Sequence, residues 1–267
     1  MAELQVELGV QAGSRPVVVE KTVAVQRDSG TMTAHRVGVV SAIFRYPVKS
    51  MAAQSLDRAE IGWSGIDGDR RWAFVREGME RSGFPWLTLR QAPELWQYIP
   101  RFVDPARPET SVTMVRTPSG EDLDVVDPAL ARELGHGARV IKQARGIFDA
   151  FPLSLITSQT VAGVSSLADA ELDVRRFRPN FVVDASDGRS FTEDEWVGRV
   201  LRIGGMSMRV DKRDKRCITV NVDPVTSGKN PSVLRAIAEG RDSQLGVYAS
   251  TVSQGLVTVG DGVSIEA

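Results

Sequence analysis

Apolar residues recur along most of this chain at the spacing of β-strands. From Val37 onward, short apolar runs are interrupted by glycine, proline and aspartate, which is the pattern of an all-β sandwich or barrel. The runs that predict strands are residues 37–46, 56–61, 70–76, 111–116, 139–143, 178–184, 199–210, 217–222 and 256–260. The sequence therefore predicts a mostly β protein.

A few segments carry the start and stop signals of short helices instead. Proline at the first helical position, a side-chain cap before it and glycine after the last turn are such signals. They predict helices after Asp127 up to Gly135, from a Ser158 cap through Leu167, after a Thr192–Glu195 capping box, and from Asn230 to near Gly240.

A break in composition at residues 146–151 predicts a domain boundary. We expect a smaller β-rich domain at residues 35–148 and a second domain at residues 149–267. Residues 1–34 fit neither domain. We expect them to be an N-terminal extension, either disordered or upstream of a native start at Met32.

Composition narrows the possible functions. The chain has 267 residues and a net charge of −1, which argues against a nucleic-acid-binding surface. No apolar stretch approaches the ~20 residues that a membrane helix needs, and the N-terminus lacks the pattern of a secretory signal. The one cysteine cannot form an internal disulfide. We therefore expect a cytoplasmic protein that binds neither nucleic acid nor membrane.

That single cysteine, Cys217, follows the densest run of positive charge in the chain. Nearby cations favour a thiolate, so a lowered pKa is predicted for Cys217. A thiolate is a nucleophile and a ligand for soft metals such as molybdenum, copper or zinc. The alternative is a small buried apolar residue without chemistry. The cations of the run are Lys212, Arg213, Lys215 and Arg216.

The residues after the cysteine sharpen this prediction. If residues 217–222 form a strand, three apolar side chains share one face, and Cys217, Thr219 and Asn221 share the other. The apolar face would meet a core, which leaves the opposite face free to line a polar cavity. The alternative is an edge strand whose polar face meets water.

Basic and polar residues at other strand ends are candidates for binding an anion. In an extended segment, Arg178 and Asn180 would point the same way and offer a guanidinium fork beside an amide. Lys49 and Ser50 end the first predicted strand, where charge and hydrogen bonding suit a phosphate. Arg70 stands at the mouth of the strand that follows a turn. For each residue taken alone, a solvated surface charge remains the alternative.

Together these motifs resemble the MOSC family, named for the C-terminal domain of molybdenum cofactor sulfurase. The chain more closely resembles members such as amidoxime-reducing components, in which an N-terminal β-barrel-like domain precedes the MOSC domain. The resemblance implies that residues 35–148 and 149–267 are these two domains, the second with a barrel-like core and a few short helices. It rests on Tyr46–Ser50, Gly68–Trp72, Arg90–Pro93, Phe177–Asn180, Arg216–Cys217, Val222–Pro224 and Val259–Asp261.

The resemblance implies a molybdenum–pterin cofactor. Cys217 would be the metal ligand and the catalytic residue. The match is weaker at Ala150, where relatives often have a hydroxyl residue. The residues that would bind the phosphate and pterin are Lys49, Ser50, Arg70, Asp149, Ala150, Arg178, Asn180, Lys215 and Arg216.

The resemblance also implies a molybdenum-dependent oxidoreductase that reduces small N-hydroxylated compounds, such as amidoximes or hydroxylamines. The sequence contains neither a ferredoxin-like module nor the cysteines for an iron–sulfur cluster. We therefore expect electrons to come from a separate protein of ferredoxin or cytochrome type. The alternative is a carrier that holds the molybdenum cofactor, or sulfur as a Cys217 persulfide, for delivery without redox turnover.

Overall fold

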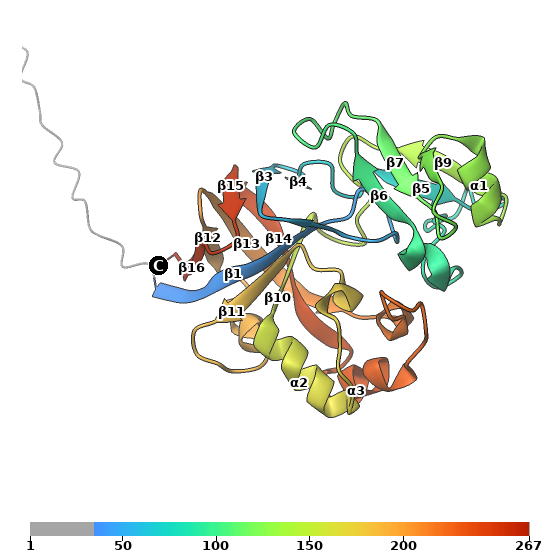
Figure 1. Ribbon diagram of the computed structural model, residues 1–267. Helices are drawn as coiled ribbons and strands as arrows, with labels where there is room; N and C mark the ends of the chain where they lie inside the picture. The colour runs from blue at the N-terminus through green and yellow to red at the C-terminus, as the bar shows by residue number, and fades with distance from the viewer. Residues whose placement is uncertain (1–34, 267) are drawn as a thin grey trace, which may run out of the picture. The chain divides into compact units, whose positions relative to one another are not determined.

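The centre of the fold is a closed β-barrel whose first strand comes from the N-terminal half of the chain (Figure 1). The computed structural model describes residues 35–266. Strand β1 (His35–Arg45) pairs with β11 (Phe181–Ala185) and with β16 (Gly262–Ile265), and these two pairings close the barrel. The remaining barrel strands, in order from β11, are β10 (Leu153–Thr157), β14 (Gln244–Ser253), β13 (Met206–Lys215) and β12 (Val200–Ile203).

Alternation along the strands fills the barrel with apolar side chains. Met208 and Val210 of β13 are buried, whereas Arg209 between them is exposed. Val247 and Ala249 of β14 are buried in the same cluster. The prediction of a mostly β fold with a barrel and few helices is confirmed.

Shorter strands form smaller sheets beside the barrel. In the one built from β3, β4 and β15, a C-terminal strand pairs with an N-terminal one. This pairing and β1–β11 both cross residue 148 of the chain, and the described residues 35–266 belong to one compact unit. The strands of these smaller sheets are β3 (Arg58–Gly62), β4 (Gly65–Ile66), β5 (Trp72–Val75), β6 (Ile99–Phe102), β7 (Thr113–Arg116), β8 (Asp122–Asp124), β9 (Arg139–Lys142) and β15 (Gly255–Thr258). Strand β2 (Gln54–Leu56) instead pairs with β1 in the barrel sheet.

The predicted domain boundary near residue 148 stays a prediction. The expectation for residues 1–34 lies outside the described residues. No helix within residues 35–266 is long and apolar enough to cross a membrane.

The described residues contain three α-helices, each close to a predicted one. Helix α1 (Pro128–Leu134) begins after Asp127, whose side chain accepts from the Ala129 backbone, and ends at Gly135 as predicted. Helix α3 (Pro231–Arg241) is capped by Asn230. Helix α2 (Ser158–Ala168) lies against α3 (Figure 1).

Two predicted helix caps were wrong. Helix α2 is capped by Thr157, whose hydroxyl accepts from the Thr160 backbone N at 3.2 Å, and Ser158 is its first residue. The predicted capping box at Thr192 does not form, because the Thr192 hydroxyl donates to Asp187 instead. That segment is the 3₁₀ helix η3 (Thr192–Trp196), one of four within residues 35–266, with η1 (Pro93–Gln97), η2 (Val174–Phe177) and η4 (Ile218–Asn221).

Three predicted strands also differ from the structure. The predicted strand 199–210 is a hairpin, since Gly204 (φ 53°) and Gly205 turn the chain between β12 and β13. Strand β11 begins only at Phe181, because Arg178 adopts a left-handed conformation (φ 51°) after η2. Residues 218–221 form η4 instead of a strand, and Ile218 is 56% exposed instead of facing a core.

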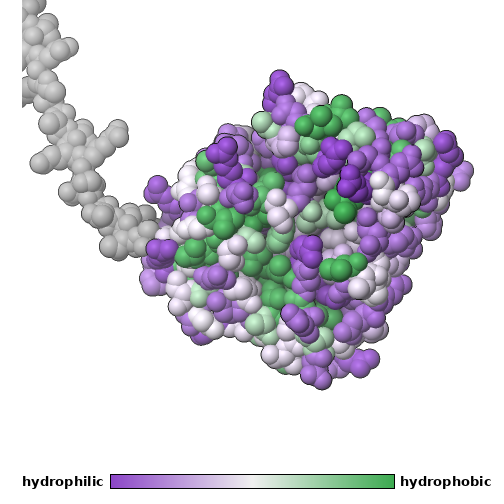
Figure 2. Space-filling view, in the orientation of Figure 1, coloured by the Kyte–Doolittle hydropathy of each residue, from purple (hydrophilic) through white to green (hydrophobic). Residues whose placement is uncertain are grey.

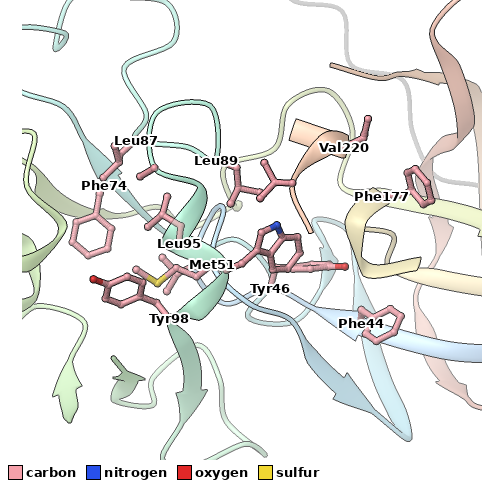
Figure 3. Close-up of a cluster of buried hydrophobic side chains, with 14 of the residues drawn as sticks. Phe44, Tyr46, Met51, Phe74, Leu87, Leu89, Leu95, Tyr98, Phe177 and Val220 are labelled. Carbon is pink, nitrogen blue, oxygen red and sulfur yellow. The ribbon is translucent and has the colours of Figure 1, made fainter. Parts of the chain in front are cut away.

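A second apolar cluster joins the two halves of the described chain (Figure 3). Phe44, Tyr46 and Met51 come from the N-terminal half, and Phe177 and Val220 come from the C-terminal half. On the face shown in Figure 2, hydrophobic residues gather near the middle and hydrophilic residues surround them. The second cluster is important for function because residues next to it in the sequence line a pocket.

Candidate functional site

A pocket in the described chain collects nearly all of the predicted site residues. The enclosed space has a volume of about 100 Å³. Ala150 is the exception, since it is exposed and is absent from the lining. The predicted residues that line the pocket are Lys49, Ser50, Arg70, Asp149, Arg178, Asn180, Lys215, Arg216 and Cys217.

One side of the pocket is organised by Asp69, a buried carboxylate that the sequence analysis did not select. It follows a turn at Gly68 (φ 79°) and is 1% exposed. Its oxygens accept from the Tyr46 backbone N at 2.7 Å and from Asn180 Nδ2 at 3.1 Å, and it forms an ion pair with Arg70. Burial opposes the charge of Arg70, but Asp69 outweighs this effect and raises the pKa of Arg70. Asp69 therefore fixes both the backbone and the cation on this side.

Two guanidinium groups lie over the ring of Tyr46. The Arg70 and Arg178 carbons are 4.6 and 4.2 Å from the ring centre, and Arg178 is also 4.8 Å from that of Trp96. Arg178 Nη1 donates to the Met51 carbonyl at 2.8 Å, whereas Nη2 is buried and has no hydrogen-bond partner among the described residues. Burial, together with nearby Arg70, lowers the pKa of Arg178 to about 10. Arg178 is therefore a cation with an unused buried donor.

Arg178 and Asn180 both line the pocket, but not as the predicted extended pair. The left-handed conformation of Arg178 turns its carbonyl toward Arg70, whose Nη2 donates to it at 3.0 Å. Asn180 is buried, and its amide nitrogen donates to Asp69 and to the Phe44 carbonyl at 3.2 Å. In this structure Asn180 therefore holds the wall together, and its role in ligand binding stays a prediction.

Lys49 and Ser50 lie on a tight turn after β1. Lys49 is buried, and its Nζ donates to the Ile147 carbonyl at 3.1 Å and to Asp149 Oδ1 at 2.5 Å. Burial lowers the pKa of Lys49, although Asp149 opposes the shift. Burial also disfavours ionisation of Asp149, but Lys49 outweighs that and lowers its pKa. Ser50 is buried with φ 70°.

Cys217 is half-buried at the start of η4. Its Sγ lies 3.2 Å from Thr219 Oγ1. Burial disfavours the thiolate, but Thr219 and the guanidinium of Arg90 outweigh it, so the pKa of Cys217 is lowered. Arg90 also lines the pocket. The site therefore favours the thiolate form of Cys217, and this thiolate lines the same pocket as the buried cations.

The direction of this pKa shift was predicted correctly, but its cause was not. The groups that lower it most are Thr219 and Arg90, not the four cations before Cys217. Lys215 is exposed and lines the pocket. The other three cations contact different partners: Arg216 Nη1 lies 2.8 Å from Asp214 and 2.7 Å from the Phe177 carbonyl, Lys212 Nζ lies 5.4 Å from the Phe151 ring centre, and Arg213 lies 3.6 Å from Asp194.

Comparison with known families identifies the architecture around this pocket. A family model described as the MOSC domain matches residues 142–264, and one described as the MOSC N-terminal beta barrel domain matches residues 37–144. The chain belongs to the MOSC family. The two matches meet near residue 143, and Lys49, Arg70 and Arg90 lie in the first while Arg178 and Cys217 lie in the second. This MOSC pocket is thus lined from both matched regions.

Among curated MOSC relatives are amidoxime-reducing components and molybdenum cofactor sulfurases. Mitochondrial amidoxime-reducing component 1 of Danio rerio is 35% identical, over 43% of this chain and 37% of the relative. The Xenopus laevis protein of that name is 24% identical, over 85% and 82%. Molybdenum cofactor sulfurase of Caenorhabditis elegans is 25% identical, over 77% and 32%. The chain thus spans about a third of the length of the first relatives it matches.

The donor groups of the pocket fit a molybdenum–pterin cofactor. The unpartnered Nη2 of Arg178 calls for an acceptor, and a phosphate oxygen is such an acceptor. Lys49 and Arg70 add positive charge, and the Cys217 thiolate suits a soft metal. The pocket volume of about 100 Å³ is below the roughly 150 Å³ of a cavity that binds benzene, so this space alone would not enclose a pterin.

Sequence reasoning missed several residues of this MOSC pocket or its walls, among them four polar residues that affect its chemistry. Arg90 and Asp69 do stand in short motifs that carry the family resemblance, which was the available signal. Asp214 lies within the basic run, where the surrounding cations obscured it, and Tyr248 stands in an apolar strand without any motif. Both line the pocket, and burial raises the pKa of Asp214 to about 6, against the influence of Arg216.

Proposed function

We propose that this protein binds a molybdenum–pterin cofactor in the pocket and reduces N-hydroxylated compounds such as amidoximes or hydroxylamines. The observation that carries the proposal is the opening of the Cys217 thiol, with its lowered pKa, into the same pocket as the unpartnered buried donor of Arg178. Relatives named for amidoxime reduction support the reaction class.

Each side of the pocket would have its own task. Arg178, Lys49 and Arg70 would bind the anionic part of the cofactor, and Asp69 would keep Arg70 in place. Cys217 would bind the metal, with Arg90 and Thr219 favouring its thiolate form. The bound cofactor supplies two-electron chemistry, while the protein supplies orientation and charge.

Electrons would come from a separate protein of ferredoxin or cytochrome type, and the one cysteine of this sequence, assigned here to the metal, would not also hold an iron–sulfur cluster. The other partner would be the small N-hydroxylated substrate. A cytoplasmic location belongs to the same proposal and rests on composition alone.

A second candidate is a carrier that holds the cofactor, or sulfur as a Cys217 persulfide, and passes it to another enzyme. Two observations favour it: the half-exposed thiol, and relatives named molybdenum cofactor sulfurase that match over 77% of this chain. A carrier needs the same cations and thiol but no catalytic turnover.

Purification from a host that makes the cofactor would separate these functions. We expect near-stoichiometric molybdenum and pterin by mass spectrometry, and benzamidoxime reduction with a chemical electron donor. Cys217→Ala and Cys217→Ser should both lose the activity, by about 10³-fold or more, because neither side chain supplies a thiolate. Tight cofactor binding with transfer to an apo-enzyme, but no reduction, would favour the carrier. Full activity of Cys217→Ala would contradict the reductase proposal.

A further inference from the structure

Asp214 is a buried carboxyl group in the pocket wall, and the proposed cofactor binding does not use it. It lies near the end of β13, is 3% exposed and forms an ion pair with Arg216 at 2.8 Å. Tyr248 of the adjacent strand β14 lies close enough to favour the ionised form of Asp214, and both residues line the same pocket as Cys217. Arg216 is also anchored elsewhere, since its Nε donates to the Leu245 carbonyl at 2.7 Å. A carboxyl and a phenol thus lie together beside the thiol.

Several other ionisable groups of the pocket are poor proton donors at neutral pH, or are held by other partners. The described lining residues include neither histidine nor glutamate. Lys49 is engaged by Asp149 and the Ile147 carbonyl. Arginine stays protonated at neutral pH, so Arg70 and Arg178 cannot readily release a proton. Asp149 is held ionised by Lys49, which lowers its pKa. Cleavage of an N–O bond, however, consumes protons as well as electrons.

We propose that Asp214 supplies a proton to the substrate oxygen through the hydroxyl of Tyr248 when the N–O bond breaks. This inference rests on the proposed reductase function. It makes Tyr248 the group that contacts the substrate, and Asp214 the group that acts through Tyr248.

The proton and electron balance of this step is simple. Two electrons come from the electron-transfer protein and enter the N–O bond, which breaks. The Tyr248 hydroxyl gives its proton to the departing oxygen, and the Tyr248 oxygen takes the proton of Asp214. A second proton, from solvent, forms the new N–H bond, so that the products are the N–H compound and water. Asp214 is then protonated again from solvent.

The surroundings of Asp214 suit such a donor. Burial raises its pKa to about 6, and the negative charge of Asp149 acts in the same direction. Arg216, Tyr248 and Arg70 act in the opposite direction, so the carboxyl can both take up and release a proton near neutral pH. Burial raises the pKa of Tyr248, which therefore remains a hydroxyl donor. Because the protonated acid is the active form, kcat should fall as the pH rises through about 6.

The test compares Asp214→Asn and Tyr248→Phe with the wild type, each loaded with cofactor and supplied with a chemical reductant. We expect kcat for benzamidoxime to fall by about 10²-fold or more in both variants, with molybdenum content unchanged. The fall of kcat with rising pH near 6 should disappear in Asp214→Asn and return in Asp214→Glu. Asp211→Asn, on the same strand but outside the pocket lining, should keep the wild-type rate and pH profile.

A second readout does not depend on activity. In cofactor-free protein, infrared difference spectra should show a buried carboxylic-acid carbonyl band that titrates near pH 6 and is absent from Asp214→Asn. Wild-type rate and pH profile in loaded Asp214→Asn would overturn the inference and leave the proposed function standing. Activity losses that only follow molybdenum loss in both variants would also overturn it. If loaded wild-type protein reduces no N-hydroxylated compound, both proposals fall.

Discussion

The two sides of the pocket are built in different ways. The arginine wall consists of Tyr46, Asp69, Arg70, Arg178 and Asn180, whose contacts join segments far apart in the sequence. The cysteine turn consists of residues 217–219, where the half-buried thiol contacts the hydroxyl of Thr219 two residues away. One side is a buried hydrogen-bonded network, and the other is a short turn partly open to solvent.

The difference follows from what each side must hold. A buried cation is tolerated only with fixed partners, so the arginine wall has to be rigid. A thiol that binds a metal has to be reachable and needs only a few contacts to favour its ionised form. We therefore expect substitution of the buried ion pair in the arginine wall to change stability, and substitutions of groups that face the ligand or the thiol to change binding or chemistry.

Asp69→Asn should have the largest effect on stability. The change removes the counter-charge of Arg70 and places an amide against the Nδ2 of Asn180. Breaking a buried ion pair in this way costs about 3–5 kcal/mol of unfolding free energy, measurable by urea denaturation. Asp122→Asn is the matched control, because the pairs of Asp122 with Arg116 and Arg101 are open to solvent and contribute little to stability. Equal losses in the two variants would remove the distinction between the two sides.

Arg178→Met should weaken cofactor retention more than it weakens the fold. A methionine keeps apolar contact with Tyr46 and Trp96 but removes the unpartnered donor Nη2. A charged hydrogen bond is worth about 1.5–3 kcal/mol, so retention of molybdenum and pterin after dialysis should fall by at least about 10-fold. Arg175→Met, whose side chain pairs with Asp173 outside the pocket lining, should retain both. Unchanged retention in Arg178→Met would remove Arg178 from the anion site.

Arg90→Met tests the cysteine turn. Burial already disfavours the thiolate, and loss of the guanidinium should raise the pKa of Cys217. The thiolate fraction at pH 7, and with it the rate of iodoacetamide alkylation of cofactor-free protein, should fall several-fold. The free energy of unfolding should change by about 0.5 kcal/mol or less. Arg213→Met removes a cation that is closer to Cys217 in the sequence and should leave the alkylation rate unchanged. If Arg213→Met slowed alkylation and Arg90→Met did not, the basic run before Cys217 would be what lowers the pKa of the thiol.

The same contrast explains what the sequence could predict. Helix α1 was predicted correctly because its signals at Asp127, Pro128 and Gly135 are local. The thiol and most of the other predicted site residues do line the pocket, and they could be selected because their chemical types are unusual where they stand. The strand predicted at 217–222 was wrong because Val220 and Val222 fit a period of two, while long-range contacts of Arg216 fix the turn before them.

Local sequence patterns could not predict which residues contact a buried charged group. Asp69 binds Tyr46 and Asn180, which are distant in the chain, and Arg90 approaches Cys217 from the other matched region. Spacing rules describe neighbours along a helix or strand, whereas these pairs exist only after the barrel has closed. Asp69 and Arg90 lie in motifs that carry the family resemblance, but those motifs do not indicate which groups the two residues contact.

Thr219→Val should have the smallest effect and gives the finest test of the cysteine turn. Valine has nearly the same shape but lacks the hydroxyl that lies 3.2 Å from Cys217 Sγ. Burial of the thiol would then be opposed mainly by Arg90 and by the backbone N–H of residue 219. Because Arg90 lowers the pKa of Cys217 through both a hydrogen bond and its charge, whereas the Thr219 side chain acts through a hydrogen bond alone, the pKa should rise by less than in Arg90→Met. The pH dependence of alkylation in cofactor-free protein measures both shifts, and a larger shift in Thr219→Val would show that the local hydroxyl, not the distant cation, controls the thiolate.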